Sequence, residues 1–396
     1  MKIVTAMSAE GDPRAALADI ARQIETTEAR GPDFIALHVN AAYDRTALQK
    51  AALSLGARAL HGGSSCLGIM TEQGLSLGDD QGLGCFALWD EEGDYATGSA
   101  ALSLGAAQAG AAAVSAALEA IGRVGEAPDL IWLTSVPGSE EEVIAGIETV
   151  VGAKVPIVGG SAADNDISAA WYTFDKEGAY GSAVVISVLF PSTDVSCAYS
   201  SGYTPTQTKG IATRVEGREL VEIDNKPAGD VYRRWTGGRI PAATPERQSI
   251  LWKSTLAPLG RSTSSLGSVA FHLLAHPAAL HADETLSLFA NVQEGEEIVL
   301  MQGSEDSLVG RAGRIARMAS GRNIHQDRRI EGALVVYCAG CMLAVRERMQ
   351  EVADGINAAL PGTPFLGIFT FGEQGSVVSG SNRHANLMIS CVTFAA

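Results

Sequence analysis

An internal repeat constrains the fold of this chain more than any other feature, because a repeated unit must bury the same face each time it occurs. The apolar run 32–37 predicts a strand, a helix is expected around 48–60, and the copy ends at the segment 61–66, His-Gly-Gly-Ser-Ser-Cys. The same order starts again at 128–133 and ends at the segment 158–163, Val-Gly-Gly-Ser-Ala-Ala. From the proline of each copy to its first glycine the separations are 30 and 31 residues. The chain therefore contains at least two copies of one unit.

Each copy is preceded by a predicted helix and continued by a predicted strand. The helices cover 17–24 and 106–121, and the strands cover 84–89 and 183–190. A third, looser copy is expected near the C-terminus, with a helix at 308–319, a strand at 333–337, a helix around 345–356, and strands from 365 and from 386. Strand–helix–strand order favours a parallel pair, and the strands that follow make each sheet mixed. We predict an α/β fold in two lobes, with mixed β-sheets flanked by helices and built from repeated helix-strand-helix-strand-strand units.

The repeat is interrupted between about 209 and 303. In this interval 215–223 predicts a pair of strands, 227–235 a short helix that begins with proline, and 265–300 several strands. A polar loop with a proline is expected at 204–207. We therefore predict two domains, residues 1–206 with two repeated units and residues 207–396.

Charge and cysteine content narrow the class of function. The 396 residues include 29 Lys and Arg against 45 Asp and Glu, a net charge of -16, which repels phosphate backbones and anionic lipid headgroups. We expect neither a nucleic-acid nor a membrane partner. The six cysteines are too sparse for a disulfide scaffold, and the N-terminus has no signal-peptide pattern, so a cytoplasmic location is predicted. The uncharged segment 99–118 consists of Ala, Gly and Ser, and predicts a packed helix rather than a membrane span.

Common catalytic and nucleotide motifs are missing. No lysine follows a glycine, which excludes a P-loop, and no G-x-G-x-x-G follows a strand, which leaves nicotinamide chemistry unsupported. A serine-hydrolase elbow centred on Ser64 would need glycine at Cys66. Cys338 and Cys341 have C-x-x-C spacing, but a zinc site lacks a second pair. The two cysteines are either packed thiols or a reactive thiol site. We expect a protein without enzymatic activity, and chemistry at these thiols is the less favoured alternative.

The two Gly-Gly-Ser segments are expected to form turns at strand ends. In one interpretation their glycines let backbone N–H groups approach a ligand, and in the other they only allow a tight turn or a close strand–helix crossing. The residues concerned are Gly62, Gly63, Ser64, Gly159, Gly160 and Ser161.

Three of the seven histidines crowd into the segment 271–281. If this segment is a strand, His272 and His276 point to one face among Leu, Phe and Ala, so an imidazole could meet an apolar ligand that carries a metal, such as haem. The alternative is a set of hydrogen-bonded or half-exposed histidines. Glu373, Arg383 and His384 lie in polar segments between apolar strands, and form either an internal network or part of a site.

The order of these motifs resembles the FIST family of sensory domains, in which an N-terminal and a C-terminal domain occur together. The likeness covers essentially the whole chain. It is carried by 61–66, 158–161, Glu216-Gly217-Arg218, Pro227-Ala228, Val231-Tyr232, 336–340, Phe369-Thr370-Phe371-Gly372-Glu373 and Asn382-Arg383-His384-Ala385-Asn386.

The resemblance implies signal input through a partner, either a histidine kinase or a diguanylate cyclase or phosphodiesterase. One branch of the family binds haem b non-covalently and senses nitric oxide, so we expect a haem-based nitric oxide sensor. The iron ligand would be His276 first, then His272 or His281, with His384 and His61 less favoured. The alternative is a receptor for a small molecule such as an amino acid, whose pocket is lined by Gly62, Gly63, Gly159, Gly160, Glu373 and Arg383. A reactive Cys338 or Cys341 is the third hypothesis. The sequence leaves the oligomeric state open, with a homodimer as one candidate.

Overall fold

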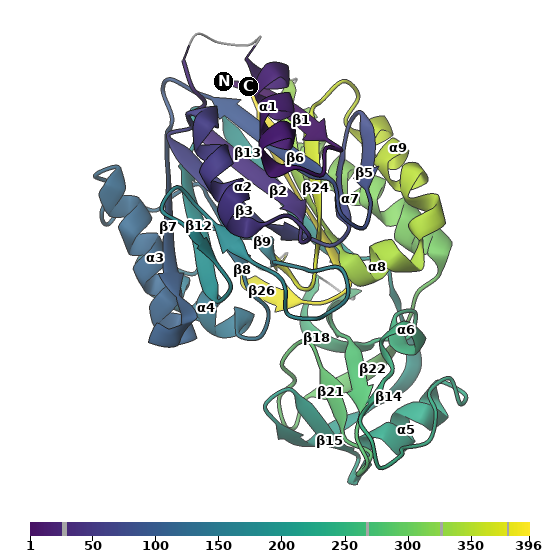
Figure 1. Ribbon diagram of the computed structural model, residues 1–396. Coiled ribbons are helices and arrows are strands. Elements are labelled where there is room, and N and C mark those ends of the chain that lie inside the picture. Colours follow the sequence, from purple (N-terminus) through teal and green to yellow (C-terminus); the bar gives the residue numbers. More distant parts are fainter. Residues whose placement is uncertain (26–29, 267–268, 325–327, 378–379) are drawn as a thin grey trace.

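The chain forms a large body of three sheets with a smaller lobe at one end (Figure 1). The smaller part, residues 204–302, contains a separate nine-stranded sheet, and we call it the inserted lobe. The rest is the three-sheet body. The mixed α/β class predicted from the sequence is confirmed. The computed structural model describes residues 1–25, 30–266, 269–324, 328–377 and 380–396.

The first sheet of the body has the order β1-β6-β2-β3-β10-β11. Strands β2 and β3 are parallel, and β6 lies antiparallel to β2 on its other side. Helix α1 begins after Asp12, whose side chain accepts from two N–H groups of the first turn, and Pro13 follows at the first helical position. The elements of this unit are β1 Lys2–Ser8, α1 Pro13–Ile24, β2 Phe34–Asn40, α2 Arg45–Ala52, β3 Ala59–Ser65, β4 Gly68–Thr71, β5 Gly74–Leu77 and β6 Leu83–Trp89.

The second sheet repeats this plan in the order β26-β25-β9-β8-β12-β7. Strands β8 and β9 are parallel, and β12 is antiparallel to β8. The elements of this unit are β7 Asp94–Ala101, α3 Ala106–Ala120, β8 Leu130–Ser135, α4 Glu140–Val151, β9 Ile157–Ser161, β10 Thr173–Phe174, β11 Ala179–Tyr180 and β12 Ala183–Phe190.

The third sheet completes the repeat in the order β13-β27-β23-β24-β4-β5. Its parallel pair is β23 and β24, with β27 antiparallel to β23. The third copy, the loosest in sequence, is therefore a full structural unit, and the inserted lobe interrupts it between β13 and α7. Its elements are β13 Asp194–Ser201, α7 Glu305–Ile324, β23 Ile330–Cys338, α8 Ala339–Ala344, α9 Met349–Ala359, β24 Phe365–Thr370, β25 Glu373–Ser376, β26 Asn382–Ala385 and β27 Met388–Ala395.

The three units exchange hairpins in a ring. Hairpin β4–β5 of the first unit pairs with β24 of the third, β10–β11 of the second pairs with β3 of the first, and the hairpin β25–β26 of the third pairs with β9 of the second. The units thus cannot separate without breaking sheet hydrogen bonds. This exchange was not predicted from the sequence.

A shared apolar core fills the centre of the body. It joins side chains from all three sheets, among them Phe34, Trp132, Leu189, Leu366 and Phe394. A helix pair covers the outer face of each sheet, so strands such as β2 are buried along their whole length. The helices α3 and α4 touch at Gly110 and Gly146, where a Cβ would lie 2.4 Å and 1.9 Å from backbone oxygens of the other helix.

The inserted lobe is a twisted antiparallel sheet with two short helices. Its longest strand, β14, pairs with β15 and β22, and helix α5 packs on this sheet through its buried residues Val231 and Tyr232. Its elements are β14 Thr204–Glu216, β15 Glu219–Ile223, β16 Lys226–Pro227, α5 Ala228–Trp235, β17 Gln248–Ser249, α6 Leu251–Ser254, β18 Leu259–Leu266, β19 Val269–Ala275, β20 Pro277–Leu280, β21 Leu286–Leu288 and β22 Glu297–Gln302.

Some local predictions were wrong. The expected loop at 204–207 is the beginning of β14, because this segment pairs with β22. The helix expected to reach 60 ends at Ala52 and is followed by a single 3-10 turn, since Leu60 already belongs to β3. The last strand begins at Met388 rather than at Asn386. Of the described helices, none is long and apolar enough to cross a membrane.

Candidate functional site

A cavity of about 250 Å³ lies between the inserted lobe and the strand ends of the body. The body contributes residues at or just after the carboxyl ends of its parallel strands, where α/β sheets commonly bind ligands: Cys66, Asn165, Cys338 and Thr370. The inserted lobe contributes residues of α6 and of the loops after β19 and β21: Leu251, Trp252, His276 and Phe289. The other lining residues are Asp166, Ile167, Ser249, Gly340, Leu343, Phe371 and Asn386.

Of the histidines named above, His276 is the one that lines this cavity. Its Nε2 lies 3.2 Å from the carbonyl oxygen of Leu251 and 3.4 Å from Oγ1 of Thr255. Burial lowers the pKa of His276 to about 4, so the ring is neutral at pH 7. A neutral ring whose Nε2–H donates to Leu251 fits these contacts.

Asn386 holds the backbone of His276 in place. Its Oδ1 accepts the backbone N–H of His276 at 3.1 Å, and its own N–H donates to the carbonyl of Leu274 at 3.0 Å. The Nδ2 atom of Asn386 is buried, and no described residue accepts a hydrogen bond from it. A buried amide donor without a partner is unfavourable, and such groups usually have a ligand or a water.

Cys338 lines the cavity and contacts the buried carboxyl group of Glu373. Oε1 of Glu373 accepts from Thr370 at 2.9 Å and its Oε2 accepts from the N–H of Met388 at 2.9 Å. Burial raises the pKa of Glu373 well above its ordinary value, and the neighbouring Cys338 raises it further. Burial also raises the pKa of the Cys338 thiol, with hydrogen bonding to Cys341 adding to the effect. Cys338 is therefore a neutral thiol at pH 7.

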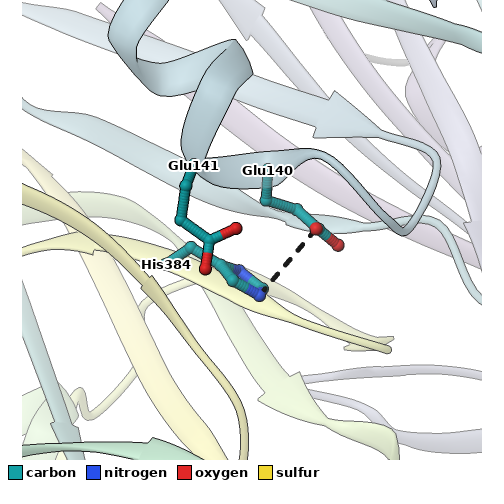
Figure 2. Close-up of side chains that lie close together, drawn as sticks. All are labelled: Glu140, Glu141 and His384. Carbon is teal, nitrogen blue, oxygen red and sulfur yellow. Dashed lines mark ion pairs between the residues drawn. The ribbon is translucent and has the colours of Figure 1, made fainter. Parts of the chain in front are cut away.

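A charged cluster lies beside the cavity at the same junction (Figure 2). Glu140 and Glu141, in the first turn of α4, face His384 on β26. Arg218 of the inserted lobe reaches both carboxylates, with Nη2 2.6 Å from Glu140 Oε2 and 2.7 Å from Glu141 Oε2. The N–H of Asn291 donates to Glu141 Oε1 at 2.9 Å. These contacts join the lobe to the body.

The carboxylates of the cluster are paired within it, whereas Oε1 of the adjoining Gln374 is buried and has no partner among the described residues. Burial alone would raise the pKa of Glu140, but His384, Arg218 and the hydroxyl of Ser161 outweigh it and lower the pKa to about 2. His384 Nε2 is 4.0 Å from Glu140 Oε2, and Gln374 Nε2 lies 3.2 Å from its Nδ1. Among the described residues, Glu140, Glu141 and His384 are the group whose ligand atoms approach within 4.8 Å, as a metal site would need. Arg218 already provides a cationic partner for both carboxylates.

Phe289 contacts both the cavity and the charged cluster. Its ring lines the cavity, with its centroid 6.0 Å from that of His276, and its N–H donates to the carbonyl of His276 at 3.2 Å. Its own carbonyl oxygen is 3.4 Å from His384 Nε2. A displacement of Phe289 would therefore change its contact with His384 in the charged cluster.

The Gly-Gly-Ser segments are strands rather than the predicted turns. Gly62 and Gly63 lie in β3, and Gly159 and Gly160 lie in β9. A Cβ at Gly62 would lie 2.1 Å from the ring of Phe174, because the exchanged β10–β11 hairpin packs there. For the other three glycines the nearest atoms, at 1.9 to 2.6 Å, belong to Thr134, Leu133 and Thr370. These glycines thus make room for neighbouring chain segments and do not line the cavity.

The serines of these segments also serve the body. Ser64 Oγ accepts the N–H of Tyr172 at 3.0 Å, and Ser161 Oγ donates to Glu140 Oε1 at 2.7 Å. Arg383, next to His384, is exposed and donates to the carbonyl of Asn382 at 2.8 Å. Glu373 and Arg383 therefore do not line one common pocket.

His272, His281 and His61, which were also predicted as iron ligands, do not line the cavity. His272 is half-buried in β19, which ends before His276, so the predicted strand does not carry both rings. His281 lies 3.3 Å from Glu219, within the inserted lobe. His61 is fully buried in the body between Ser187 and Thr134, at 2.9 Å and 2.8 Å. The predicted cluster of histidines is not assembled in space.

Several residues of this junction were not predicted as site residues. Arg218 and Asn386 stand within motifs used for the family resemblance, but no local pattern marks them as partners of Glu140 or His276. Arg218 and Glu140 are 78 residues apart, and Asn386 and His276 are 110 apart. Contacts between residues so far apart along the chain depend on the fold and cannot be predicted from the spacing of residues in the sequence.

The expected haem does not fit the cavity as it stands. Pockets for drug-sized ligands measure roughly 300–1,000 Å³, and the flat macrocycle of haem needs more room than about 250 Å³. Nε2 of His276 already contacts Leu251. Among the described lining residues there is no Lys or Arg to pair with the propionates.

Comparison with known proteins identifies the family. Residues 33–226 match the FIST N domain, and residues 228–376 match the FIST C domain. No curated protein matches the chain. Among solved structures, Thermotoga maritima PurL complexed with ATP is 9% identical with a TM-score of 0.23, covering 77% of this chain and 73% of that chain. PurLQS from the same organism is 8% identical with a TM-score of 0.23, covering 77% and 72%. These TM-scores are too low to support an inference about fold or ligand.

Proposed function

The chain belongs to the FIST family, whose N and C domains it carries together, and from this premise we propose that it binds a small molecule in the cavity between body and lobe. FIST domains form a sensory signal-transduction family. In this proposal the bound ligand favours one arrangement of the inserted lobe against the body, and a partner protein responds to that arrangement.

The unpaired amide of Asn386 is the observation that carries the proposal. Asn386 lines the cavity, and its Nδ2 lies buried behind that wall without an acceptor among the described residues. A buried polar group left without a partner costs roughly 1–3 kcal/mol. A ligand whose hydrogen-bond acceptor reaches Nδ2 through a small shift of this wall would remove this cost, and apolar walls would add the burial of its surface.

The charged cluster supplies the coupling. Arg218 and Asn291 of the lobe hold Glu140 and Glu141 of the body, while Phe289 touches both the cavity and His384. A ligand that displaces the Phe289 ring would move the backbone that also carries Asn291. The signal would then be a shift in the contacts between lobe and body.

Haem-based nitric oxide sensing is the second candidate. It is favoured by one feature, a neutral buried histidine, His276, on the cavity wall, since neutral imidazole is the form that ligates iron. Haem would supply the gas-binding iron. His276 would have to leave Leu251, and the cavity would have to widen. A Soret band after reconstitution that persists in a His276→Ala variant would exclude His276 as the ligand.

We propose binding rather than catalysis. A thiol nucleophile needs a lowered pKa, and burial raises the pKa of Cys338 and brings that of Cys66 to about 12. Signalling through a histidine kinase, or through a diguanylate cyclase or phosphodiesterase, and action in the cytoplasm, as a monomer or a homodimer, complete the proposal.

A thermal-shift screen of small molecules on the full chain tests the proposal. A ligand at about 100 times its dissociation constant stabilises the folded state by roughly 2.7 kcal/mol. We expect hits whose shift disappears in Leu343→Trp, because Leu343 lines the cavity and the larger indole fills it. Leu104→Trp is the matched control, since Leu104 is 59% exposed and does not line the cavity. Hits that act equally on wild type and Leu343→Trp would place binding elsewhere and contradict the proposal.

A further inference from the structure

The lining residues and the volume of the cavity limit the size and shape of a ligand that it can hold. Aromatic side chains come from both sides of the junction, with Trp252 and Phe289 from the lobe and Phe371 from the body. Leu251 and Leu343 add aliphatic surface. A cavity of about 150 Å³ holds benzene, so about 250 Å³ leaves room for one aromatic ring with a short substituent.

The charges of the cavity restrict the ligand further. Among the described lining residues none is Lys or Arg, and the ionisable ones are Asp166, His276, Cys66 and Cys338. The ring of His276 is neutral at pH 7 and both thiols are protonated, because burial shifts their pKa values in those directions. The formal charge that remains is the carboxylate of Asp166, which is exposed at the rim. A negatively charged ligand would lose its hydration and find no opposite charge.

The hydrogen-bonding groups define one end of the ligand. Asn386 lines the cavity, and its unpaired Nδ2, which is a donor, lies directly behind this wall, so a ligand that reaches it has to present an acceptor. Asn386 is 2% exposed, and its Oδ1 is fixed by the N–H of His276 at 3.1 Å. The amide cannot turn its oxygen toward the ligand without breaking this bond. A phenolic oxygen or a ring carbonyl meets this requirement.

From these three observations we propose that the cavity takes a small aromatic molecule that carries no negative charge and presents a ring-borne acceptor to Asn386. This inference rests on the proposed function, since it assumes that the cavity is the ligand site. An amine on the ring substituent is compatible with Asp166 at the rim. Free amino acids and aromatic acids are disfavoured, because each has a carboxylate that no lining residue neutralises.

Isothermal titration of the full chain with four related probes tests this inference. 4-Ethylphenol is neutral, tyramine adds an amine, 4-hydroxyphenylacetate replaces it with a carboxylate, and phenethylamine lacks the hydroxyl. We expect saturable binding of 4-ethylphenol and tyramine, with 4-hydroxyphenylacetate weaker by about ten-fold or more. Phenethylamine should bind about three- to ten-fold more weakly than tyramine, because it leaves Asn386 unpaired.

Two variants check the placement of the probes. Leu343→Trp should abolish binding of tyramine and 4-ethylphenol, and Asp166→Asn should weaken tyramine while leaving 4-ethylphenol unchanged. Equal or tighter binding of 4-hydroxyphenylacetate would overturn the inference while supporting a ligand site in the cavity. Absence of saturable binding by all four probes would also overturn it, and the wider screen with Leu343→Trp then decides separately whether the cavity binds any ligand.

Discussion

The cavity and the charged cluster lie at the same junction between inserted lobe and body, but they are built from opposite kinds of contact. In the cluster the carboxylates are paired, since Arg218 reaches both Glu140 and Glu141 within 2.7 Å. In the cavity the walls are mostly apolar and the amide of Asn386 lacks a partner. The difference teaches that the cluster holds the lobe and the body together, whereas the cavity is the place where we propose that a ligand binds.

Removal of Arg218 should have the largest effect of any single change at the junction. In Arg218→Ala the carboxylate of Glu140, which is 1% exposed, loses its cationic partner. Breaking a buried pair in this way costs about 3–5 kcal/mol. The matched control is Arg214→Ala on the neighbouring strand, whose pair with Glu216 is exposed at both ends, and it should cost less than about 0.5 kcal/mol. Equal losses in urea unfolding would refute the assigned role of the cluster.

Acid should weaken the charged cluster by protonating Glu140. The pKa of Glu140 is about 2 in the folded chain against its ordinary 4.5, so its contribution is complete above pH 4.5. It is lost as the pH falls from 4.5 toward 2, which amounts to roughly 3 kcal/mol. Urea unfolding at a series of pH values measures this loss. The loss across this window should shrink in Glu140→Gln, and an unchanged pH profile would show that Glu140 is not responsible.

Changes at the cavity should cost much less stability. Asn386→Ala removes the bond to the N–H of His276 but also removes an unpaired buried donor, so we expect a loss of about 1 kcal/mol. Asn382 is the matched control from the same motif, because its amide bonds to Ile157, Glu148 and Val155 at 2.9 to 3.0 Å. Asn382→Ala should be clearly more destabilising. If the two variants unfold alike, the amide of Asn386 is not unpaired in solution.

A substitution at the rim of the cavity should weaken ligand binding without lowering the free energy of unfolding. Trp252 is 62% exposed and lines the cavity, so Trp252→Ala should change the unfolding free energy by less than about 0.5 kcal/mol. The same change should weaken any aromatic ligand, as titration would reveal. Unaltered affinity for tyramine would remove Trp252 from the ligand site.

Much of the body could be predicted from the sequence, because its units follow local periodicity. The helix expected at 106–121 is observed at Ala106–Ala120, and the strand expected at 183–190 has those bounds. The Gly-Gly-Ser segments were misjudged as turns, since glycine is common in turns and nothing local shows that the ring of Phe174 packs against Gly62. The hairpin that carries Phe174 comes from another unit.

The site was harder to predict than the fold. Histidines that are neighbours in sequence diverge in space, and only His276 of its segment lines the cavity. The residues that matter at the junction, such as Asn386 and Arg218, meet their partners through the insertion of a lobe into the third unit. Composition and spacing carry no information about such contacts.

Hydrogen exchange with and without a saturating ligand tests the central claim most directly. The N–H groups of Phe289 and Asn291 bond to His276 and Glu141 and so report on the cavity and the cluster respectively. The account predicts that a ligand bound in the cavity changes exchange at both amides, and that Leu343→Trp abolishes both changes. Ligand binding that protects the cavity residues but leaves Asn291 unaltered would contradict the claim that the cavity communicates with the junction.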